Sequence, residues 1–98
     1  MHCCLHVVVD QEDQTWVDEI QTLLLDKVPS FSFSPWRQQP SLKEGIEFYA
    51  TADITQQEFE ILKHDLNNDW DIYEDEYSAY GFNTTMFHPH VYYLRMSI

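Results

Sequence analysis

Glycine and basic side chains are scarce in this chain of 98 residues, which has two glycines and five lysines or arginines. Gly45 and Gly81 lie far apart, so no glycine-rich loop can cradle a phosphate group. The five cations stand against 17 carboxylates, and the formal charge is -12. Such a charge repels nucleic acid and anionic membranes and attracts cationic partners. We therefore expect a basic protein as the partner, and neither nucleic acid nor a membrane.

Cysteine is also rare, and the two cysteines, Cys3 and Cys4, are neighbours. Neighbouring side chains of a strand point to opposite faces, so these thiols cannot easily form a disulfide with each other. Without a disulfide framework, a reducing cytoplasm is the natural compartment. The first residues lack the pattern of a signal peptide, and no apolar run approaches the roughly 20 residues of a membrane helix. We therefore expect a cytoplasmic protein.

No arrangement typical of a catalytic site can be identified. Cys3 or Cys4 could act as a nucleophile beside His2 or His6, but the sequence indicates no third group to orient them. A reactive thiolate also prefers electropositive surroundings, which this acidic chain lacks. Buried cysteines that pack as small apolar side chains are the better interpretation. Since no carboxylate pair stands out either, we expect no enzyme activity, no catalytic residue and no cofactor.

The chain does contain enough apolar material for a packed interior. Hydrophobic residues make up 44% of the sequence and aromatic residues 15%, whereas disordered chains are poor in aromatics. A length of 98 residues suits one domain and leaves no room for a second core. We expect residues 1–98 to form a single domain.

The beginning of the sequence predicts a strand followed by a helix. Cys3–Asp10 contains the valine run of a central strand, apolar on both faces at its end. Thr15–Val28 has apolar residues at helical spacing. Asp13 or Thr15 can cap the start of this helix, and Pro29 ends it.

The middle of the sequence predicts two strands around a loop, and then a second helix. Residues 30–34 alternate serine with phenylalanine, residues 35–45 form a loop, and Gly45–Ala52 alternates as a strand. Thr55 and Glu58 have the spacing of a capping box, which predicts the start of the second helix. Two asparagines at 67 and 68 end this helix.

The last third of the sequence predicts two further strands, Asp71–Tyr80 and Phe87–Ile98, joined by a turn at residues 81–85. The resulting order is β-α-β-β-α-β with an extra C-terminal strand. That order predicts an α+β fold of the ferredoxin-like type, an antiparallel sheet with both helices on one face. The other face of the sheet is then open or covered by a partner.

The stretch from Asp65 to Tyr80 is the main candidate for a functional surface. It contains six carboxylates, and no lysine or arginine lies between His64 and Leu94. Aromatic residues, which anchor interfaces, alternate with the acids. A negative surface of this kind speeds association with a basic partner. The residues expected to bind that partner are Asp65, Asp69, Trp70, Asp71, Tyr73, Glu74, Asp75, Glu76 and Tyr77.

Small size, acidic composition and the acidic, aromatic-rich stretch Asp65–Tyr80 together resemble the small bacterial immunity proteins of contact-dependent inhibition and colicin systems. This resemblance implies a tight one-to-one complex with a basic nuclease toxin, in which the acidic face covers the active site or an adjacent surface. It implies a monomer or a weak homodimer when the protein is free. The segment Trp70–Tyr77 is also similar to the acidic strand of ferredoxin-like regulators of ribonucleases, although their extended acidic tail is absent.

Two metal-binding hypotheses compete with this interpretation. The first is a calcium loop at Asp65–Asp71, which has closely spaced oxygen ligands but lacks the glycine and the terminal glutamate of an EF-hand. The second is a small zinc- or copper-binding domain that uses two groups of soft ligands. These ligands are His2, Cys4, His6, His88 and His90. No CxxC or HExxH spacing accompanies them, so ordinary strand histidines are the better interpretation and no metal site is expected.

A further hypothesis is a ferredoxin-like regulatory domain that binds a ligand and pairs through its open sheet face. Such a domain would form a homodimer, whereas an immunity protein is expected to be mostly monomeric.

Overall fold

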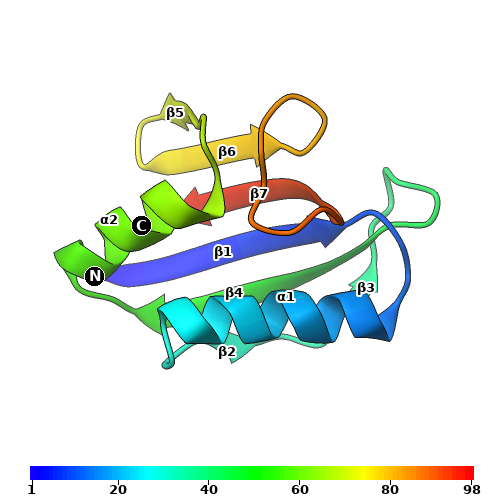
Figure 1. The fold of residues 1–98 in the computed structure, drawn as a ribbon, viewed down its shortest axis with the longest axis horizontal. Helices are drawn as coiled ribbons and strands as arrows, with labels where there is room; N and C mark the ends of the chain where they lie inside the picture. Colours follow the sequence, from blue (N-terminus) through cyan, green and yellow to red (C-terminus); the bar gives the residue numbers. More distant parts are fainter.

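The protein is an α+β structure in which a seven-stranded antiparallel sheet carries two helices on one face (Figure 1). The computed structural model describes all residues from 1 to 98. In chain order the elements are β1 (His2–Val9), α1 (Gln14–Lys27), β2 (Ser32–Phe33), β3 (Arg37–Gln38), β4 (Ile46–Asp53), α2 (Gln56–Leu66), β5 (Asp71–Tyr73), β6 (Glu76–Tyr80) and β7 (Val91–Ser97). Neither helix has the length and apolarity that a membrane crossing requires.

The strands follow the order β2-β4-β1-β7-β6-β5, and the short β3 also pairs with β4. Adjacent strands are antiparallel, so β1 and β2 run parallel with β4 between them. In the same way, β4 and β7 run parallel with β1 between them. The connection from β1 to β2 contains α1, and the connection from β4 to β7 contains α2 followed by β5 and β6.

Contrary to the expectation from the sequence, the C-terminal strand is not the additional one. It is β7, which lies beside β1 inside the sheet, whereas β6 and β5 extend the sheet at its edge (Figure 1). The difference between the two positions in the sheet follows from the side chains of these strands. Val91, Leu94 and Met96 of β7 are buried, while the carboxylates of residues 71–76 need the water that an edge position provides.

The segment Asp71–Tyr80 is a hairpin and not the single strand expected. Tyr73 pairs with Glu76 across β5 and β6, so Glu74 and Asp75 form a two-residue turn. Glu74 has a φ of 53°, the one positive φ in the chain. Glycine is the usual residue at such a position, and its absence hides the turn from sequence analysis.

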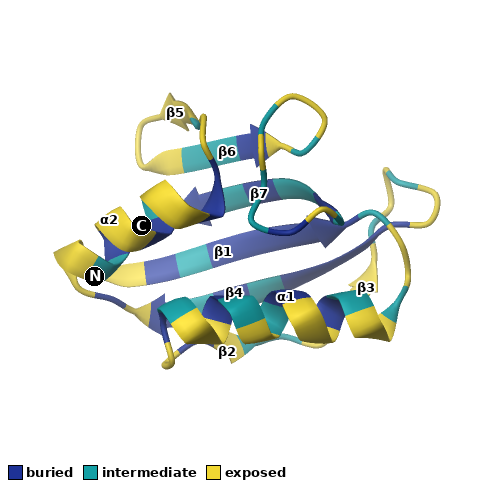
Figure 2. Cartoon of the chain, viewed as in Figure 1, coloured by how far each residue is buried: buried dark blue, intermediate teal, exposed yellow.

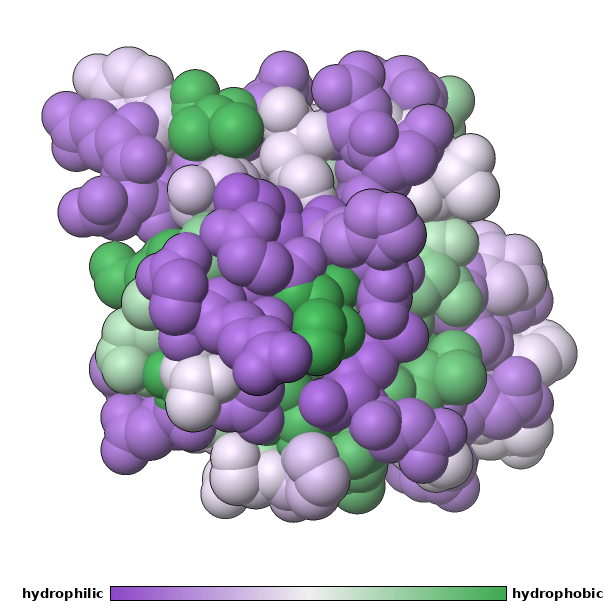
Figure 3. Space-filling model, turned by 60° about the vertical axis from the view of Figure 1, so that its left-hand side comes forward, coloured by the Kyte–Doolittle hydropathy of each residue, from purple (hydrophilic) through white to green (hydrophobic).

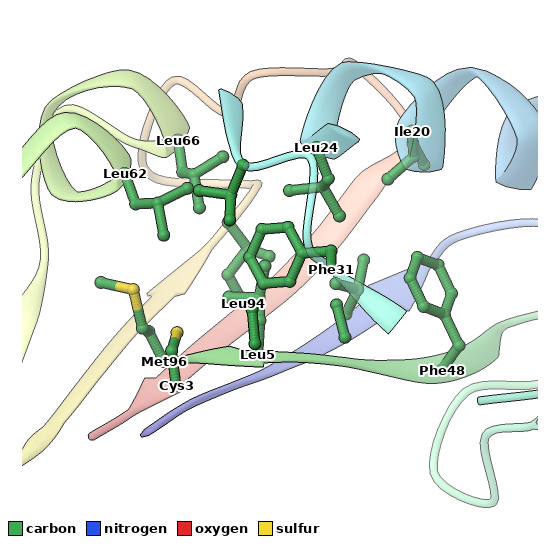
Figure 4. Close-up of a cluster of buried hydrophobic side chains, with 14 of the residues drawn as sticks. Cys3, Leu5, Ile20, Leu24, Phe31, Phe48, Leu62, Leu66, Leu94 and Met96 are labelled. Atoms are coloured by element: carbon green, nitrogen blue, oxygen red, sulfur yellow. The ribbon is translucent and has the colours of Figure 1, made fainter. Parts of the chain in front are cut away.

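The hydrophobic core is a single layer between the helices and the sheet (Figure 4). The helices bury one side each, through Val17, Ile20 and Leu24 of α1 and Phe59, Leu62 and Leu66 of α2. Alternate residues of the central strands face these side chains: Cys3, Leu5, Val7 and Val9 of β1, and Ile46, Phe48, Ala50 and Ala52 of β4. Figure 2 shows this buried layer and the exposed outer sides of both helices.

Both helix starts agree with the sequence. The Asp13 side chain caps α1 by accepting a hydrogen bond from the Thr15 backbone N–H. The Thr55 hydroxyl accepts from the Glu58 N–H, and the Glu58 carboxylate accepts from the Thr55 N–H, as a capping box requires. The structure thus confirms the strongest local prediction made from the sequence.

The other sheet face, here called the open face, carries the remaining alternate residues. Those of β1 are Cys4, His6 and Val8. The segment 37–42, here called the strap, leads from β3 onto this face, because Arg37 and Gln39 bond to Glu47, whose side chain lies on the open side of β4. The strap therefore covers only part of the open face, next to β4 and β1.

Candidate functional site

The acidic hairpin, defined as residues 71–76 with Asp69 ahead of it, forms the free edge of the sheet. Every residue of β5 and of the turn is exposed, as Figure 2 shows. Tyr73 is 75% exposed and Ile72 is 63% exposed. The hairpin therefore presents carboxylates together with two large side chains that could be buried against a partner.

The acidic hairpin has five carboxylates that are free of ion pairs. None of the ion pairs in the structure includes the five acids of this segment. They are Asp69, Asp71, Glu74, Asp75 and Glu76. The side of the molecule turned forward in Figure 3 is mostly hydrophilic, with small hydrophobic patches among polar side chains. The negative charge at the hairpin is thus left uncompensated and available to a partner.

Three of the residues expected to bind a partner have structural contacts instead. Asp65 belongs to α2, and its carboxylate lies 3.7 Å from Lys27 Nζ of α1. Trp70 donates a hydrogen bond of 2.7 Å from Nε1 to the Lys63 carbonyl. Tyr77 packs edge-on against Phe59 at 5.4 Å between ring centroids.

Trp70 and Tyr77 therefore hold the acidic hairpin to the end of α2. Both are partly buried against the core, and their rings meet edge to face at 6.3 Å. The sequence alone does not distinguish these roles, because the same aromatic residue types anchor protein interfaces and pack inside a protein. The candidates that are exposed and have no such structural contact are Asp69, Asp71, Tyr73, Glu74, Asp75 and Glu76.

The geometry gives no support to the calcium-loop hypothesis for Asp65–Asp71, because two of its side-chain oxygen ligands, those of Asn67 and Asn68, take part in hydrogen bonds within the protein. The Asn67 amide donates to Thr84 Oγ1 at 2.7 Å, and its Oδ1 accepts from the Asp69 N–H. Asn68 Oδ1 accepts from the Thr85 N–H at 2.7 Å. These bonds tie the junction between α2 and β5 to the loop at 84–86.

The histidine and cysteine ligands considered from the sequence lie at different ends of the sheet. His2 pairs with exposed Asp53 at 3.6 Å. At the other end of β1, His90 Nδ1 bonds to Asp10 Oδ1 at 2.9 Å and its ring stacks on Trp16. No group of three or more histidine, cysteine or carboxylate side chains is placed to hold a metal ion. The geometry thus gives the soft-metal hypothesis no support.

The cysteines are both free, and one of them is fully buried. Burial, with a smaller contribution from Cys4, raises the pKa of Cys3 to about 11. This thiol therefore stays protonated at neutral pH and packs in the core cluster as a small apolar side chain.

A buried polar network on the open face centres on Glu47, which is 2% exposed. Its carboxylate accepts hydrogen bonds from His6 Nε2 at 2.8 Å, Arg37 Nε at 2.6 Å and Gln39 Nε2 at 3.1 Å. Burial alone would raise the pKa of Glu47, but the bonds from His6 and Arg37 outweigh it and hold that pKa below its ordinary value. Glu47 therefore remains ionised and fastens the strap to the sheet.

Next to this network lies a hollow, here called the aromatic pocket, with a cavity volume of about 280 Å³. It is lined by His6, Val8, Gln39, Ser41, Leu42, Tyr80, Tyr92 and Tyr93. A β-bulge shapes one wall, because β7 has the extra residue Tyr92 between the partners of Val8 and Val9. Tyr92 and Tyr93 can therefore both line the same hollow.

Close backbone packing fixes the end of this wall. A Cβ on Gly81 would lie 2.5 Å from the Val91 carbonyl oxygen, and the Gly81 N–H donates to the Tyr92 carbonyl at 2.7 Å. Glycine is needed here for space and not for an unusual φ. The tyrosine at position 80 is thereby held against the two tyrosines of β7.

Sequence analysis did not identify the aromatic pocket. One signal was present: Glu47 is a carboxylate in a strand whose other face is fully apolar, and His6 alternates with the core residues of β1. In the pairing of β1 with β4, His6 lies opposite Tyr49 and Glu47 lies opposite Val8, so His6 and Glu47 are diagonal neighbours. No local sequence pattern specifies that register.

Comparison with protein-family models, with curated proteins and with solved structures gives no match for this chain. Its function is therefore inferred from its own geometry and charge.

Proposed function

We propose that this protein binds a basic protein through the acidic hairpin and inhibits it, in the manner of an immunity protein that neutralises a nuclease toxin. The observation that carries the proposal is the set of five carboxylates, none of them in an ion pair, on one exposed hairpin. Neighbouring surface carboxylates repel one another, and a cationic partner relieves that repulsion.

Inhibition would work by exclusion of substrate. A nuclease site is basic because it holds phosphates, so the carboxylates of Asp71, Glu74 and Asp75 can occupy the positions of phosphate groups. Long-range attraction speeds the encounter. Burial of Tyr73 and Ile72, both largely exposed in the free protein, would then slow dissociation.

The packing that holds the acidic hairpin in place suits this role. Trp70 and Tyr77 fix it to α2, so little conformational freedom is lost when a partner binds. A flexible acidic tail would lose more.

Three further assignments belong to the proposal. We assign the β2-β4-β1-β7 part of the sheet, with its two split pairs, to the ferredoxin-like arrangement, extended by the β5–β6 hairpin. We place the protein in the cytoplasm, where its two free cysteines would stay reduced. We expect a monomer or a weak homodimer before the partner binds.

The test is charge reversal at the hairpin, in the variant with Asp71, Glu74 and Asp75 all changed to lysine. The partner to use is the basic domain encoded by the gene adjacent to that of this protein. We expect association to slow by at least tenfold and the affinity to lose most of its dependence on salt concentration. Stopped-flow association rates and affinities at several ionic strengths measure both effects.

The matched control reverses three other exposed acids, Glu12, Asp26 and Glu44, none of which takes part in an ion pair. It changes the net charge by the same amount at other places on the surface. Equal effects of the two triple variants would show that only net charge matters. An unchanged affinity in the hairpin variant would show that the partner binds elsewhere.

A regulator of a cellular ribonuclease would use the same surface in the same way. The identity of the captured partner, a toxin domain or a housekeeping ribonuclease, separates these two functions.

A further inference from the structure

The aromatic pocket lies at the opposite end of β6 from the acidic hairpin, because β6 begins at Glu76 in the hairpin and ends at Tyr80 in the pocket wall. It therefore has no evident part in binding through the hairpin. Small-molecule sites have volumes of about 300–1,000 Å³. With about 280 Å³, this pocket suits one ring system better than a large cofactor.

The walls of the pocket are suited to a flat aromatic ligand. Tyr80 and Tyr93 lie 4.8 Å apart between ring centroids, and Leu42 of the strap lines the pocket with them. Aromatic rings gain energy from stacked and edge-to-face contacts beyond the burial of their area. No lysine, arginine or carboxylate lines the pocket itself.

A cation without a partner lies beside the pocket. Arg95 pairs in register with His6 on one side and with Ser78 on the other, so its side chain lies on the open face. It is two residues from Tyr93, about 7 Å along the strand. Lys27, Lys63 and Arg37 have carboxylate partners, whereas the exposed Lys43 and the half-buried Arg95 have none.

Arg95 is thus the only partly buried lysine or arginine without an ion pair. Guanidinium groups bind carboxylates through two parallel hydrogen bonds. Arg95 therefore adds a specific contact for an anion next to the ring-binding walls.

His6 provides a further contact at the pocket. Its Nε2 donates a hydrogen bond to the Glu47 carboxylate, and in the tautomer with the proton on Nε2 the Nδ1 atom is an acceptor. Nδ1 is buried and has no partner. Because His6 is only 9% exposed and lines the pocket, a ligand that enters deeply enough to donate an N–H would satisfy this atom.

We propose that the aromatic pocket and Arg95 form a binding site for a small aromatic carboxylate, whose ring lies against the tyrosines and whose negative group pairs with the Arg95 guanidinium. The protein would then have a ligand-binding face in addition to its acidic edge.

Three probes that share one ring test the proposal: indole-3-acetate, indole-3-acetamide and tryptamine, which carry a negative, a neutral and a positive group. Each is titrated into the isotopically labelled whole protein at physiological ionic strength, and backbone amide shifts are followed by NMR. We expect saturable shifts at Val8, Leu42 and Tyr93. Indole-3-acetate should bind about tenfold more tightly than the amide, because it alone can pair with the guanidinium.

Two variants locate the contacts. Arg95→Gln should lower the affinity for indole-3-acetate to that for the amide and leave amide binding unchanged. Tyr80→Ala should weaken all three probes by about tenfold. Tyr73→Ala, which removes an exposed tyrosine of the acidic hairpin, is the matched control and should change nothing.

Tightest binding by tryptamine would overturn the proposal and assign the pocket to a cationic group. Absence of saturable shifts at the pocket, or an Arg95→Gln variant with undiminished preference for the anion, would also overturn it. None of these outcomes depends on the basic partner, so the two proposals can fail separately.

Discussion

Glu47 is the one carboxylate that the fold buries, and it connects three separate parts of the open face. Replacement of Glu47 by alanine leaves His6 Nε2 and Gln39 Nε2 without their acceptor. A buried donor left without its acceptor costs about 1–3 kcal/mol, and we expect a reduction of about that size in the free energy of unfolding. Urea denaturation measures it.

Asp53→Ala is the control for this residue. It removes a carboxylate that also pairs with a histidine, His2, but both side chains are largely exposed. Exposed pairs contribute less than about 1 kcal/mol. Similar losses in the two variants would show that the Glu47 network adds nothing beyond a surface pair.

The pH dependence of stability should also reflect Glu47. Its pKa in the folded protein is lower than the ordinary value of 4.5. A carboxylate of this kind contributes stability that is present above the unfolded pKa and is lost as pH falls through the folded pKa. Wild-type protein should therefore lose more stability than Glu47→Gln between about pH 5 and pH 3. Parallel curves for the two proteins would exclude this contribution.

Among the elements, the β5–β6 hairpin has a turn that its sequence does not favour. A non-glycine residue in the left-handed region costs about 1–2 kcal/mol, and glycine recovers this at an entropic cost of about 0.5–1 kcal/mol. We expect Glu74→Gly, at the positive φ, to raise the free energy of unfolding by about 0.5 kcal/mol. The same change should weaken binding to a basic partner.

Asp75→Gly is the matched control in the same turn. Asp75 has no positive φ, so glycine there adds only the entropic cost and should destabilise the protein. Thermal or urea unfolding gives the change in the free energy of unfolding for both variants. If both glycines destabilise equally, Glu74 is under no strain in the turn.

The elements also show where local patterns suffice. The capping box at Thr55 and Glu58 specifies the start of α2 and was predicted from four residues of sequence. The hairpin was missed because Glu74 occupies a position where glycine or asparagine usually marks the turn. The position of β7 beside β1 was missed because strand order depends on pairing between distant segments.

At the scale of the whole molecule, the charge of -12 should make stability depend on salt. Added sodium chloride screens repulsion among the carboxylates, so we expect the melting temperature to rise from low salt to about 0.5 M, where the Debye length falls to a few ångströms. In the variant with Asp71, Glu74 and Asp75 changed to lysine, the melting temperature should rise less with salt, because that variant has less charge repulsion at low salt. A melting temperature independent of salt in wild type would contradict this account.

The sequence by itself determined the α+β composition, the two helices with their caps, the alternation of the central strands and the net charge. These follow from spacing, capping residues and counts, which are local or additive. Only the tertiary structure decided which acidic residues are exposed and which aromatics support them. It also brought Glu47, His6 and Arg37 together and left the half-buried Arg95 without an ion pair on the sheet face that carries Tyr93. Those arrangements depend on strand order and register, and these are set by the packing of the whole core.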